Sequence, residues 1–402
     1  MGAPPPDDLW HRVLAPHPVV QDLRRVLEQI YRPGFLVGGV VRDILLYRDR
    51  ADFRAFDLDL VVVGDPDPVV QALEQAGYRV TKRSQFRTFR LEGPAGKLDV
   101  AMARTETYPE PATLPRVRPA RSLKEDLARR DFTINSMALE LFPTFGRVLD
   151  PFGGRQDLEE GWIRVLHLQS FRDDPTRAFR AVRYRVRFGF RYAPETRVLF
   201  PDARRYMARL SFERVKNELM RIAQEPEPGR VMEEVAEYGL LQAFRNTWQP
   251  DPEVLARLKD LRLQHDDEWP ALLVPFVLGP EADLESLPLP RPDRQMLETL
   301  RRLLREPPPR DLAEAFDRYE RVPPRWLEIA AVLAGHQGLA TLAQRLRQIR
   351  PCLRGNDLEA LGLRGAEVGH MLREIRKQWV LGNLQSCEEE KRWVQAHLQS
   401  RP

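Results

Sequence analysis

The sequence predicts a protein of the α+β class, in which a mixed sheet with helices over residues 1–145 precedes an all-helical part. In the first part, short apolar strand patterns alternate with helical patterns, and the strand pattern at residues 35–37 runs directly into Gly38 and Gly39. After residues 151–154, apolar residues recur at helical spacing and strand patterns are almost absent. We therefore expect one sheet-containing region followed by groups of helices.

The first part reads as helices and strands in alternation. Its first long helix is predicted to end before Pro33 and Gly34, because neither residue suits a helix interior. The helices of this part are predicted at residues 19–31, 40–47 and 69–76. The strands are predicted at residues 35–37, 56–63, 78–81, 88–92 and 97–103.

The second part is divided by proline clusters, which interrupt helical periodicity. The clusters lie at residues 288–292, 307–309 and 323–324. Helices are predicted at residues 176–188, 212–224 and 230–238, with a compact helical group at 356–398. We expect four regions, at residues 1–145, 146–225, 226–350 and 351–402.

The composition is that of a folded chain without a membrane-spanning segment. Of the 402 residues, 43% are hydrophobic and 30% are charged, and no apolar run approaches the roughly 18 to 20 residues that cross a bilayer. Residues 1–8 show no positively charged region followed by an apolar stretch, so we expect no secretory signal, no membrane contact and a cytoplasmic location.

The net charge and the number of cysteines exclude few classes of function. A net charge of +4 and a pI of about 9.1 permit an anionic partner without requiring one. Cys352 and Cys387 are too few for a disulfide framework or a cysteine-based zinc site, and we expect both to be incidental.

Two carboxylates mark a candidate catalytic strand. Asp57 and Asp59 lie two residues apart in the strand pattern at residues 56–63, so their side chains project from one face of the strand. Neighbouring carboxylates repel each other without a cation, and ligand sets made only of oxygen suit Mg²⁺. A bound Mg²⁺ aligns attacking and leaving oxygens in phosphoryl transfer. The pair therefore predicts a magnesium site.

A glycine turn stands upstream of these carboxylates. Gly38 and Gly39 separate a strand pattern from a helical pattern, and their small size lets backbone N–H groups approach a triphosphate. Arg42, in the helix that follows, adds a cation. The turn therefore predicts a nucleotide-binding site.

These residues resemble a known family. The segment at residues 36–43, followed by residues 57–62, resembles the first motif of class II tRNA nucleotidyltransferases and bacterial poly(A) polymerases, which belong to the polymerase-β-like superfamily. The resemblance continues in order along the chain, and its further segments are residues 129–135, 149–158, 173–183 and, less closely, 353–362. It implies a polymerase-β-like nucleotidyltransferase head followed by an all-α neck, body and tail.

The resemblance assigns roles to the residues already singled out. Asp57 and Asp59 match the catalytic carboxylates that hold the metal ions, and Gly38, Gly39 and Arg42 match the triphosphate-binding turn. The implied cofactor is Mg²⁺.

Residues 129–135 match a second nucleotide-binding motif. In the family the positions of Arg130 and Asn135 approach the phosphates and sugar of the nucleotide, and the position of Asp131 helps to distinguish ribose from deoxyribose. Asp99 stays open, because the strand order of the superfamily permits it near the metal ions while a surface carboxylate is an equally good interpretation.

A third nucleotide-binding motif lies in the predicted helix at residues 176–188. Asp174, Arg177, Arg180 and Arg183 recur at every third residue, so neighbours in the series face each other. Asp174 and Arg177 are predicted to present an acceptor and donors to a base edge, while Arg180 and Arg183 suit phosphate or bracing. The resemblance makes Asp174 and Arg177 the amino-acid template that reads incoming CTP or ATP. The family usually has Glu where this chain has Asp173, which we expect to support the pair.

Two further regions are predicted to serve the RNA substrate. Residues 105–121 are rich in proline and arginine without periodicity, which predicts a mobile segment, and in the family a flexible loop here helps to switch from C to A addition. The helical remainder is predicted to bind the acceptor stem and elbow of tRNA through arginine-rich faces. These faces are expected at residues 204–205, 301–302 and 345–350.

Several functions remain open at this point. Addition of the whole CCA and addition of the terminal A to the tRNA 3′ end both fit the motifs. Addition of CC alone also stays open, although the loop at residues 105–121 argues mildly against it. A bacterial poly(A) polymerase is the nearest alternative, and an inactive RNA-binding protein on the same fold is an alternative of another class. A small-molecule nucleotidyltransferase would not need the predicted base-reading pair. The oligomeric state is not predicted.

Overall fold

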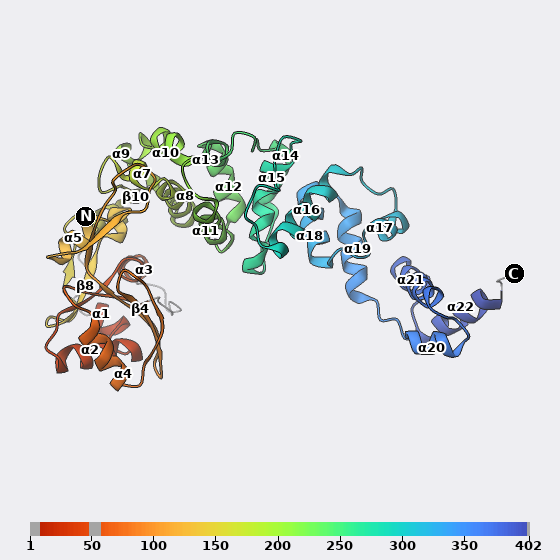
Figure 1. The fold of residues 1–402 in the computed structure, drawn as a ribbon, viewed down its shortest axis with the longest axis horizontal. Coiled ribbons are helices and arrows are strands. Elements are labelled where there is room, and N and C mark those ends of the chain that lie inside the picture. The colour runs from red at the N-terminus through yellow and green to blue at the C-terminus, as the bar shows by residue number, and fades with distance from the viewer. Residues whose placement is uncertain (1–8, 48–57, 400–402) are drawn as a thin grey trace. The chain divides into compact units, whose positions relative to one another are not determined.

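The computed structural model describes residues 9–47 and 58–399 of the chain (Figure 1). They form two compact units. The first comprises Met1–Glu218 with Tyr238–Phe244, and the second comprises Leu219–Glu237 with Arg245–Pro402. Within the described residues, the first unit holds all strands and the second is helical, which confirms the predicted α+β class. The predicted carboxylate Asp57 lies outside the described residues.

A seven-stranded mixed sheet forms the centre of the first unit, in the order β3-β4-β5-β2-β1-β8-β9. Strands β2 and β5 run parallel, and the other neighbours are antiparallel. Its strands are β1 (Gly34–Val37), β2 (Asp59–Val62), β3 (Arg79–Arg83), β4 (Thr88–Gly93), β5 (Gly96–Met102), β8 (Ala138–Phe142) and β9 (Val148–Leu149). Two further pairs join β6 (Arg104–Thr107) to β7 (Arg116–Pro119) and β10 (Trp162–Ile163) to β11 (Arg191–Tyr192). The strands predicted before residue 104 are confirmed where the structure describes them.

Each face of the sheet is covered by helices. Helix α5 (Leu123–Ala128) packs on one face against Phe35, Val37 and Val61. Helices α2 (Pro18–Gln29) and α4 (Asp67–Gln75) pack on the other side. Because side chains alternate along a strand, Asp59, two residues before Val61, projects from the same face of the sheet that α5 covers.

Among the remaining helices of the first unit, those predicted at residues 40–47, 176–188 and 212–224 are confirmed, and several short helices lie outside the predicted ranges. Helix α8 (Thr176–Phe188) has the predicted bounds, and it ends at Gly189 with a φ of 68° that favours glycine. The others are α1 (Leu9–Val13), α3 (Gly39–Tyr47), η1 (Thr133–Asn135), α6 (Gly154–Glu160), α7 (Ser170–Asp173), α9 (Pro194–Arg197), α10 (Phe200–Met207) and α13 (Leu240–Phe244). Helix α11 (Phe212–Ala223) continues from the first unit into the second.

The second unit is built from helices separated at the predicted proline clusters. Pro290 and Pro323 each directly precede a helix, where proline suits the chain because its N–H would have no helical partner. The helices are α12 (Pro228–Glu237), α14 (Pro252–Arg257), η2 (Leu258–Asp260), η3 (Asp266–Leu273), α15 (Val274–Val277), α16 (Arg291–Arg305), α17 (Leu312–Tyr319), α18 (Pro324–Ala334), α19 (Gln337–Gln348), α20 (Gly355–Ala360), α21 (Ala366–Leu381) and α22 (Cys387–Gln399).

The two cysteines form a disulfide, so the expectation that they are incidental is wrong. Cys352 precedes α20 and Cys387 begins α22, and their Cα atoms lie 5.5 Å apart. Beside the bond, the buried Glu390 accepts hydrogen bonds from the backbone N–H of Cys352 and from Trp379 Nε1. The number of cysteines gave no indication of this pairing, because the folding of helices α20 and α21 brings together two residues that are 35 apart in the sequence.

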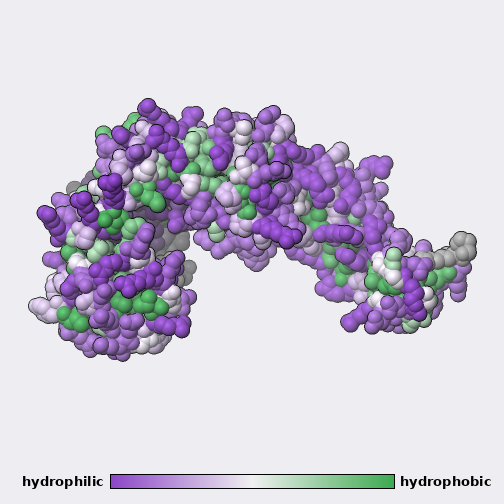
Figure 2. Space-filling view, viewed as in Figure 1, coloured by the Kyte–Doolittle hydropathy of each residue, from purple (hydrophilic) through white to green (hydrophobic). Residues whose placement is uncertain are grey.

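The surface agrees with the composition. No helix in the described part of the chain is long and apolar enough to cross a membrane. Figure 2 shows hydrophilic residues over most of the visible face, with hydrophobic residues in small separate groups.

Candidate active site

Asp59, one of the two predicted catalytic carboxylates, begins strand β2. Asp59 lies opposite Asp99 in the parallel strand β5, and alternation places both on the face that α5 covers further along, beside Val61 and Ala101. Strand β1 is antiparallel to β2, so the turn after Val37 lies at the Asp59 end of the strand. The sheet therefore brings the predicted glycine turn next to the predicted metal-binding strand.

Two arginines approach the glycine turn. Gly38 has a φ of 73°, and a Cβ atom there would lie 3.0 Å from Nη1 of Arg130. A Cβ atom at Gly39 would lie 3.4 Å from Nη2 of Arg42. Glycine thus leaves room for two guanidinium groups beside the N-terminus of helix α3, an arrangement suited to an anionic phosphate chain.

The predicted triphosphate and sugar residues form one hydrogen-bonded network. Arg42 donates through Nη1 to Asn135 Oδ1 at 2.6 Å, and Asn135 donates through Nδ2 to Asp131 Oδ1 at 3.0 Å. Arg180 donates through Nε to the other oxygen, Asp131 Oδ2, at 2.7 Å. Four of the predicted site residues therefore meet, and Arg180 braces Asp131.

Tyr184 closes this network, although the sequence did not single it out. Its hydroxyl accepts a hydrogen bond from Arg180 Nη2 at 3.1 Å, and Cζ of Arg42 lies 5.2 Å from its ring centroid. The ring of Phe188 stacks on that of Tyr184 and also lies under Arg42, with a Cζ distance of 5.0 Å. The signal in the sequence was the spacing of Arg180, Tyr184 and Phe188, which follow one another at intervals of four residues along α8.

The charges of this network support one another. Burial raises the pKa of the Asp131 carboxyl, but the charge of Arg180 and the hydrogen bond from Asn135 outweigh it and bring the pKa to about 2. Burial lowers the pKa of Arg42, but the charges of Asp43, Tyr184 and Asp131 and the hydrogen bond to Asp43 together outweigh this effect, so that the pKa is raised. Asp131 and Arg42 are therefore both ionised over the whole neutral range.

The predicted base-reading pair is held by other partners. Asp174 lies before helix α8, where its carboxylate accepts from the backbone N–H of Thr176 at 3.0 Å. Asp174 is thus outside the helix of residues 176–188, and the expectation that it continues the helical series of Arg177, Arg180 and Arg183 is wrong. The same oxygen of Asp174 accepts from Arg214 Nη2 at 2.7 Å. Arg177 is 5% exposed and donates to Ser170 Oγ at 2.9 Å and to the carbonyl of Arg129 at 2.8 Å.

Arg183 pairs with the buried Glu218 of helix α11 at 3.0 Å. Its Cζ atom also lies 5.8 Å from the ring centroid of Tyr184. The ion pair joins helices α8 and α11 of the first unit, and the bracing role considered for Arg183 stays a prediction.

The segment at residues 105–121 contains regular structure. It was predicted to be mobile and without periodicity, yet β6 and β7 pair as an antiparallel hairpin. Between them, the carbonyl of Ala112 accepts from Arg214 Nη1 at 2.9 Å, so one arginine holds both this loop and Asp174. The pattern was missed because alternation is weak in two strands of four residues each.

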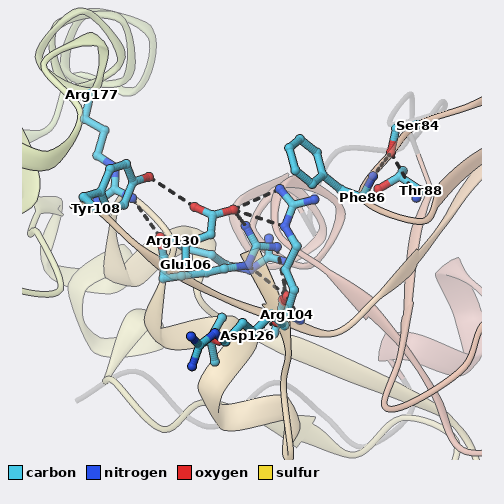
Figure 3. A network of polar contacts seen from close by, with 12 residues as sticks. Ser84, Phe86, Thr88, Arg104, Glu106, Tyr108, Asp126, Arg130 and Arg177 are labelled. Atoms are coloured by element: carbon cyan, nitrogen blue, oxygen red, sulfur yellow. Dashed lines mark hydrogen bonds and ion pairs between the residues drawn. The ribbon is translucent and has the colours of Figure 1, made fainter. Parts of the chain in front are cut away.

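A second set of contacts joins this hairpin to the nucleotide-binding motif. Glu106 of β6 accepts from Arg104 and from Arg129 Nη1, each at 2.9 Å, and Tyr108 donates to its other oxygen at 3.1 Å. Figure 3 shows Tyr108 beside Arg177 and Glu106 between the tyrosine and Arg104. The hairpin is therefore attached to both sides of the predicted base reader.

The residues present fit a divalent cation with oxygen ligands. Asp59 and Asp99 offer carboxylates on adjacent strands, although Arg90 binds both oxygens of Asp99 at 2.9 Å. Within residues 9–47 and 58–399, no cluster of three or more potential metal-ligating His, Cys, Asp or Glu side chains is present. The described contribution to such a site is thus Asp59, with Asp99 beside it.

Comparison with known proteins agrees with this geometry. Residues 34–164 match the poly(A) polymerase head domain, and residues 189–249 match the domain described as the probable RNA and SrmB-binding site of polymerase A. The chain is 33% identical to the A-adding tRNA nucleotidyltransferase of Halalkalibacterium halodurans, over 82% of this chain and 80% of that protein. The chain belongs to the tRNA nucleotidyltransferase family.

Further tRNA nucleotidyltransferases extend the similarity. The A-adding tRNA nucleotidyltransferase of Geobacter sulfurreducens is 38% identical over 61% of this chain, and the match spans 28% of that longer protein. The structure of the Thermotoga maritima CCA-adding enzyme in complex with a tRNA superposes with a TM-score of 0.70 and 25% identity, over 94% of this chain and 95% of that chain. Nucleotidyl transfer in this family generally uses a divalent metal ion, which suits the carboxylate of Asp59 in β2.

Proposed function

We propose that this tRNA nucleotidyltransferase adds the terminal A to a tRNA that ends in CC, with ATP as donor and pyrophosphate as the second product. The observation that supports this proposal is that Arg214 contacts two groups at once. It donates to the carbonyl of Ala112 in the β6–β7 hairpin and to the carboxylate of Asp174, the predicted base-reading residue. A carboxylate beside a guanidinium suits both adenine and cytosine, because each base has an exocyclic amino donor next to a ring acceptor. Selection between them therefore requires control of where Asp174 lies, and the A-adding name of the relative from H. halodurans supports ATP.

The proposed reaction joins the 3′ oxygen of the tRNA to the α-phosphorus of ATP. The bond from that phosphorus to pyrophosphate breaks, pyrophosphate leaves with the bonding electron pair, and the proton of the hydroxyl is released to water. Mg²⁺, held by Asp57 and Asp59, supplies charge neutralisation and alignment of the oxygens. Catalysis otherwise consists of positioning by the chain.

Each part of the network has a task in this proposal. Arg42 and Arg130 bind the triphosphate at the glycine turn, because both guanidinium groups approach it. Asp131, kept ionised, accepts from a ribose hydroxyl and so favours ATP over its deoxy form. Arg177 and Asp174 contact the Watson–Crick edge of the base.

Three substrates test the proposal. The purified enzyme with Mg²⁺ is given tRNAs that end before the CCA, after the first C, and after CC, each with ATP, CTP or both. Addition of one A to the CC-ended tRNA alone supports the proposal. Addition of all three nucleotides identifies a CCA-adding enzyme, and addition of C alone identifies a CC-adding enzyme.

The same assay distinguishes terminal-A addition from polyadenylation and from RNA binding without catalysis. Long A tails on any RNA would identify a poly(A) polymerase, and binding without addition would identify an inactive RNA-binding protein. The variant Asp59→Asn serves as the control, since it keeps the shape of the side chain and removes the charge that a metal ion needs. We expect it to bind the CC-ended tRNA and to add nothing. The cytoplasmic location stays a prediction.

A further inference from the structure

The strand order places the metal-binding carboxylate between two different surfaces. On one side of β2 lies β1, whose C-terminal end leads into Gly38, Arg42 and the rest of the triphosphate network. On the other side lie β5 and then β4. The triphosphate network therefore occupies one flank of Asp59, and the β5–β4 flank has no part in it.

The second flank carries a cleft with a volume of about 460 Å³. Its described lining is Leu58, Asp59, Arg90, Glu92, Lys97, Leu98 and Asp99. It is open and mainly polar, without an aromatic side chain among these residues. Such a lining suits a charged, hydrated group better than a base or an apolar ligand.

The cations of this cleft lie in a cross-strand lattice with carboxylates. Lys97 pairs with Glu92 at 2.8 Å, and the two side chains are 74% and 39% exposed. Arg90 pairs with Asp99 in the same antiparallel register, two residues further along each strand. An exposed pair such as Lys97–Glu92 contributes little to stability, so Lys97 can exchange its carboxylate for a phosphate at small cost.

Reaction geometry decides what enters this cleft. In an in-line displacement, the attacking oxygen approaches the phosphorus from the side opposite the leaving group. With pyrophosphate leaving on the flank of Gly38, the attacking 3′ hydroxyl arrives from the flank of β5 and β4. The last phosphodiester of the RNA is bonded to the nucleotide that carries this hydroxyl, so it lies on the same flank.

We propose that the β5–β4 cleft binds the 3′-terminal phosphodiester of the RNA primer, with Lys97 and Arg90 as its phosphate contacts. This inference rests on the proposed nucleotidyl transfer to RNA and deepens it. Lys97 reaches the phosphate as a flexible point charge, and Arg90 binds it while its fork also orients Asp99 beside Asp59.

The test measures whether Lys97 and one phosphate act on each other. A CC-ended tRNA minihelix is prepared with a neutral methylphosphonate in its last internucleotide linkage, and a 2′-O-methyl group on the nucleotide before that linkage protects the backbone in this RNA and in its phosphate control. Equilibrium dissociation constants are measured by fluorescence anisotropy for the wild type, Lys97→Ala and Lys124→Ala. Lys124 is an exposed lysine of helix α5 that does not line the cleft.

We expect the neutral linkage to weaken binding to the wild type and to Lys124→Ala by roughly three- to tenfold, and to leave binding to Lys97→Ala nearly unchanged. Lys97→Ala should also raise KM for the RNA without raising KM for ATP. Arg90→Lys, which keeps a cation but not the fork, should bind RNA within about twofold of the wild type, whereas Arg90→Ala should behave like Lys97→Ala.

Two results would overturn the inference. One is an equal effect of the neutral linkage on the wild type and on Lys97→Ala, and the other is a rise in KM for ATP instead of RNA. Both are separate from failure of the proposed function, because wild-type enzyme that adds no nucleotide to the unmodified minihelix refutes the transfer reaction itself.

Discussion

Replacing Arg214 with lysine should weaken the choice of ATP over CTP while leaving the fold intact. The guanidinium reaches two acceptors with two different nitrogens, Asp174 Oδ1 at 2.7 Å and the carbonyl of Ala112 at 2.9 Å. Lysine keeps the charge but has a single nitrogen on a flexible stem, and it cannot hold both acceptors in this fixed arrangement. One of the two contacts is therefore lost.

The size of the effect follows from the contact that breaks. A hydrogen bond that involves a charged group contributes about 1.5 to 3 kcal/mol. The lower end applies here, because Arg214 and Asp174 are each 22% exposed and water replaces part of the interaction. About 1.4 kcal/mol corresponds to a tenfold change, so the discrimination between the two nucleotides should fall by roughly tenfold.

The assay compares kcat/KM for ATP and for CTP on a CC-ended tRNA. Arg209→Lys is the matched control, since Arg209 is an exposed arginine of the same unit that lies over the ring of Tyr206. The ratio of the two kcat/KM values should fall in Arg214→Lys and stay unchanged in the control. An unchanged ratio in Arg214→Lys, with an unchanged melting temperature, would refute the coupling between the hairpin and Asp174.

Three further outcomes follow from other contacts. Tyr184→Phe keeps the ring below Arg42 and should raise KM for ATP by no more than about threefold. Tyr184→Leu should raise it by roughly tenfold, because it removes the cation–π contact as well. An equal rise in the steady-state KM for both variants would show that the ring has no role. Asp131→Asn removes a carboxyl whose folded pKa of about 2 lies below the unfolded value of 3.8. The stabilisation from this charge is present above pH 4 and is lost as pH falls through 2. In urea unfolding, the wild type should therefore lose about 2 kcal/mol of unfolding free energy relative to the variant between pH 5 and pH 2. A difference between the two proteins that stays constant with pH would contradict this. Reduction of the Cys352–Cys387 bond should lower the free energy of unfolding of the last helices by about 3 to 4 kcal/mol, a loss that a Cys352→Ser variant should reproduce without reductant and that a reductant should not deepen further.

The parts of the fold that depend on local pattern were predictable from the sequence. Strand β1 and helix α8 were predicted to within one residue, because each is set by the spacing of its own apolar residues. The turn at Gly38, between strand β1 and helix α3, was also predictable from the sequence, because a positive φ after a strand favours glycine.

The contacts that hold the site were not predictable in this way. Arg214 lies 40 residues from Asp174 and 102 from Ala112, and nothing in the sequence near any of the three points to the others. Asp174 was misread as part of a helix, because its three-residue spacing to Arg177 continues the helical pattern backwards past Pro175, the residue before the helix. Local spacing does not reveal which residue ends the helix.

Two arginines of the predicted basic faces already have partners within the second unit. Arg301, in one predicted basic face, donates to the carbonyl of Gly279, and Arg347, in another, pairs with Glu328. Arginine clusters in the sequence gave no indication of these partners, and the RNA-binding role of the faces stays a prediction.

Reading a base without a nucleic-acid template requires the reader to stay at a fixed place relative to the triphosphate. Two consecutive residues provide that link. Arg129 accepts from Arg177 through its carbonyl and binds Glu106 of the hairpin through its side chain, and Arg130, next in the chain, lies over Gly38. Because a peptide bond joins the two arginines, the hairpin cannot move Arg129 without disturbing either the base reader or the phosphate turn. Under the proposed function, the hairpin is therefore linked to both ends of the nucleotide through these two consecutive residues.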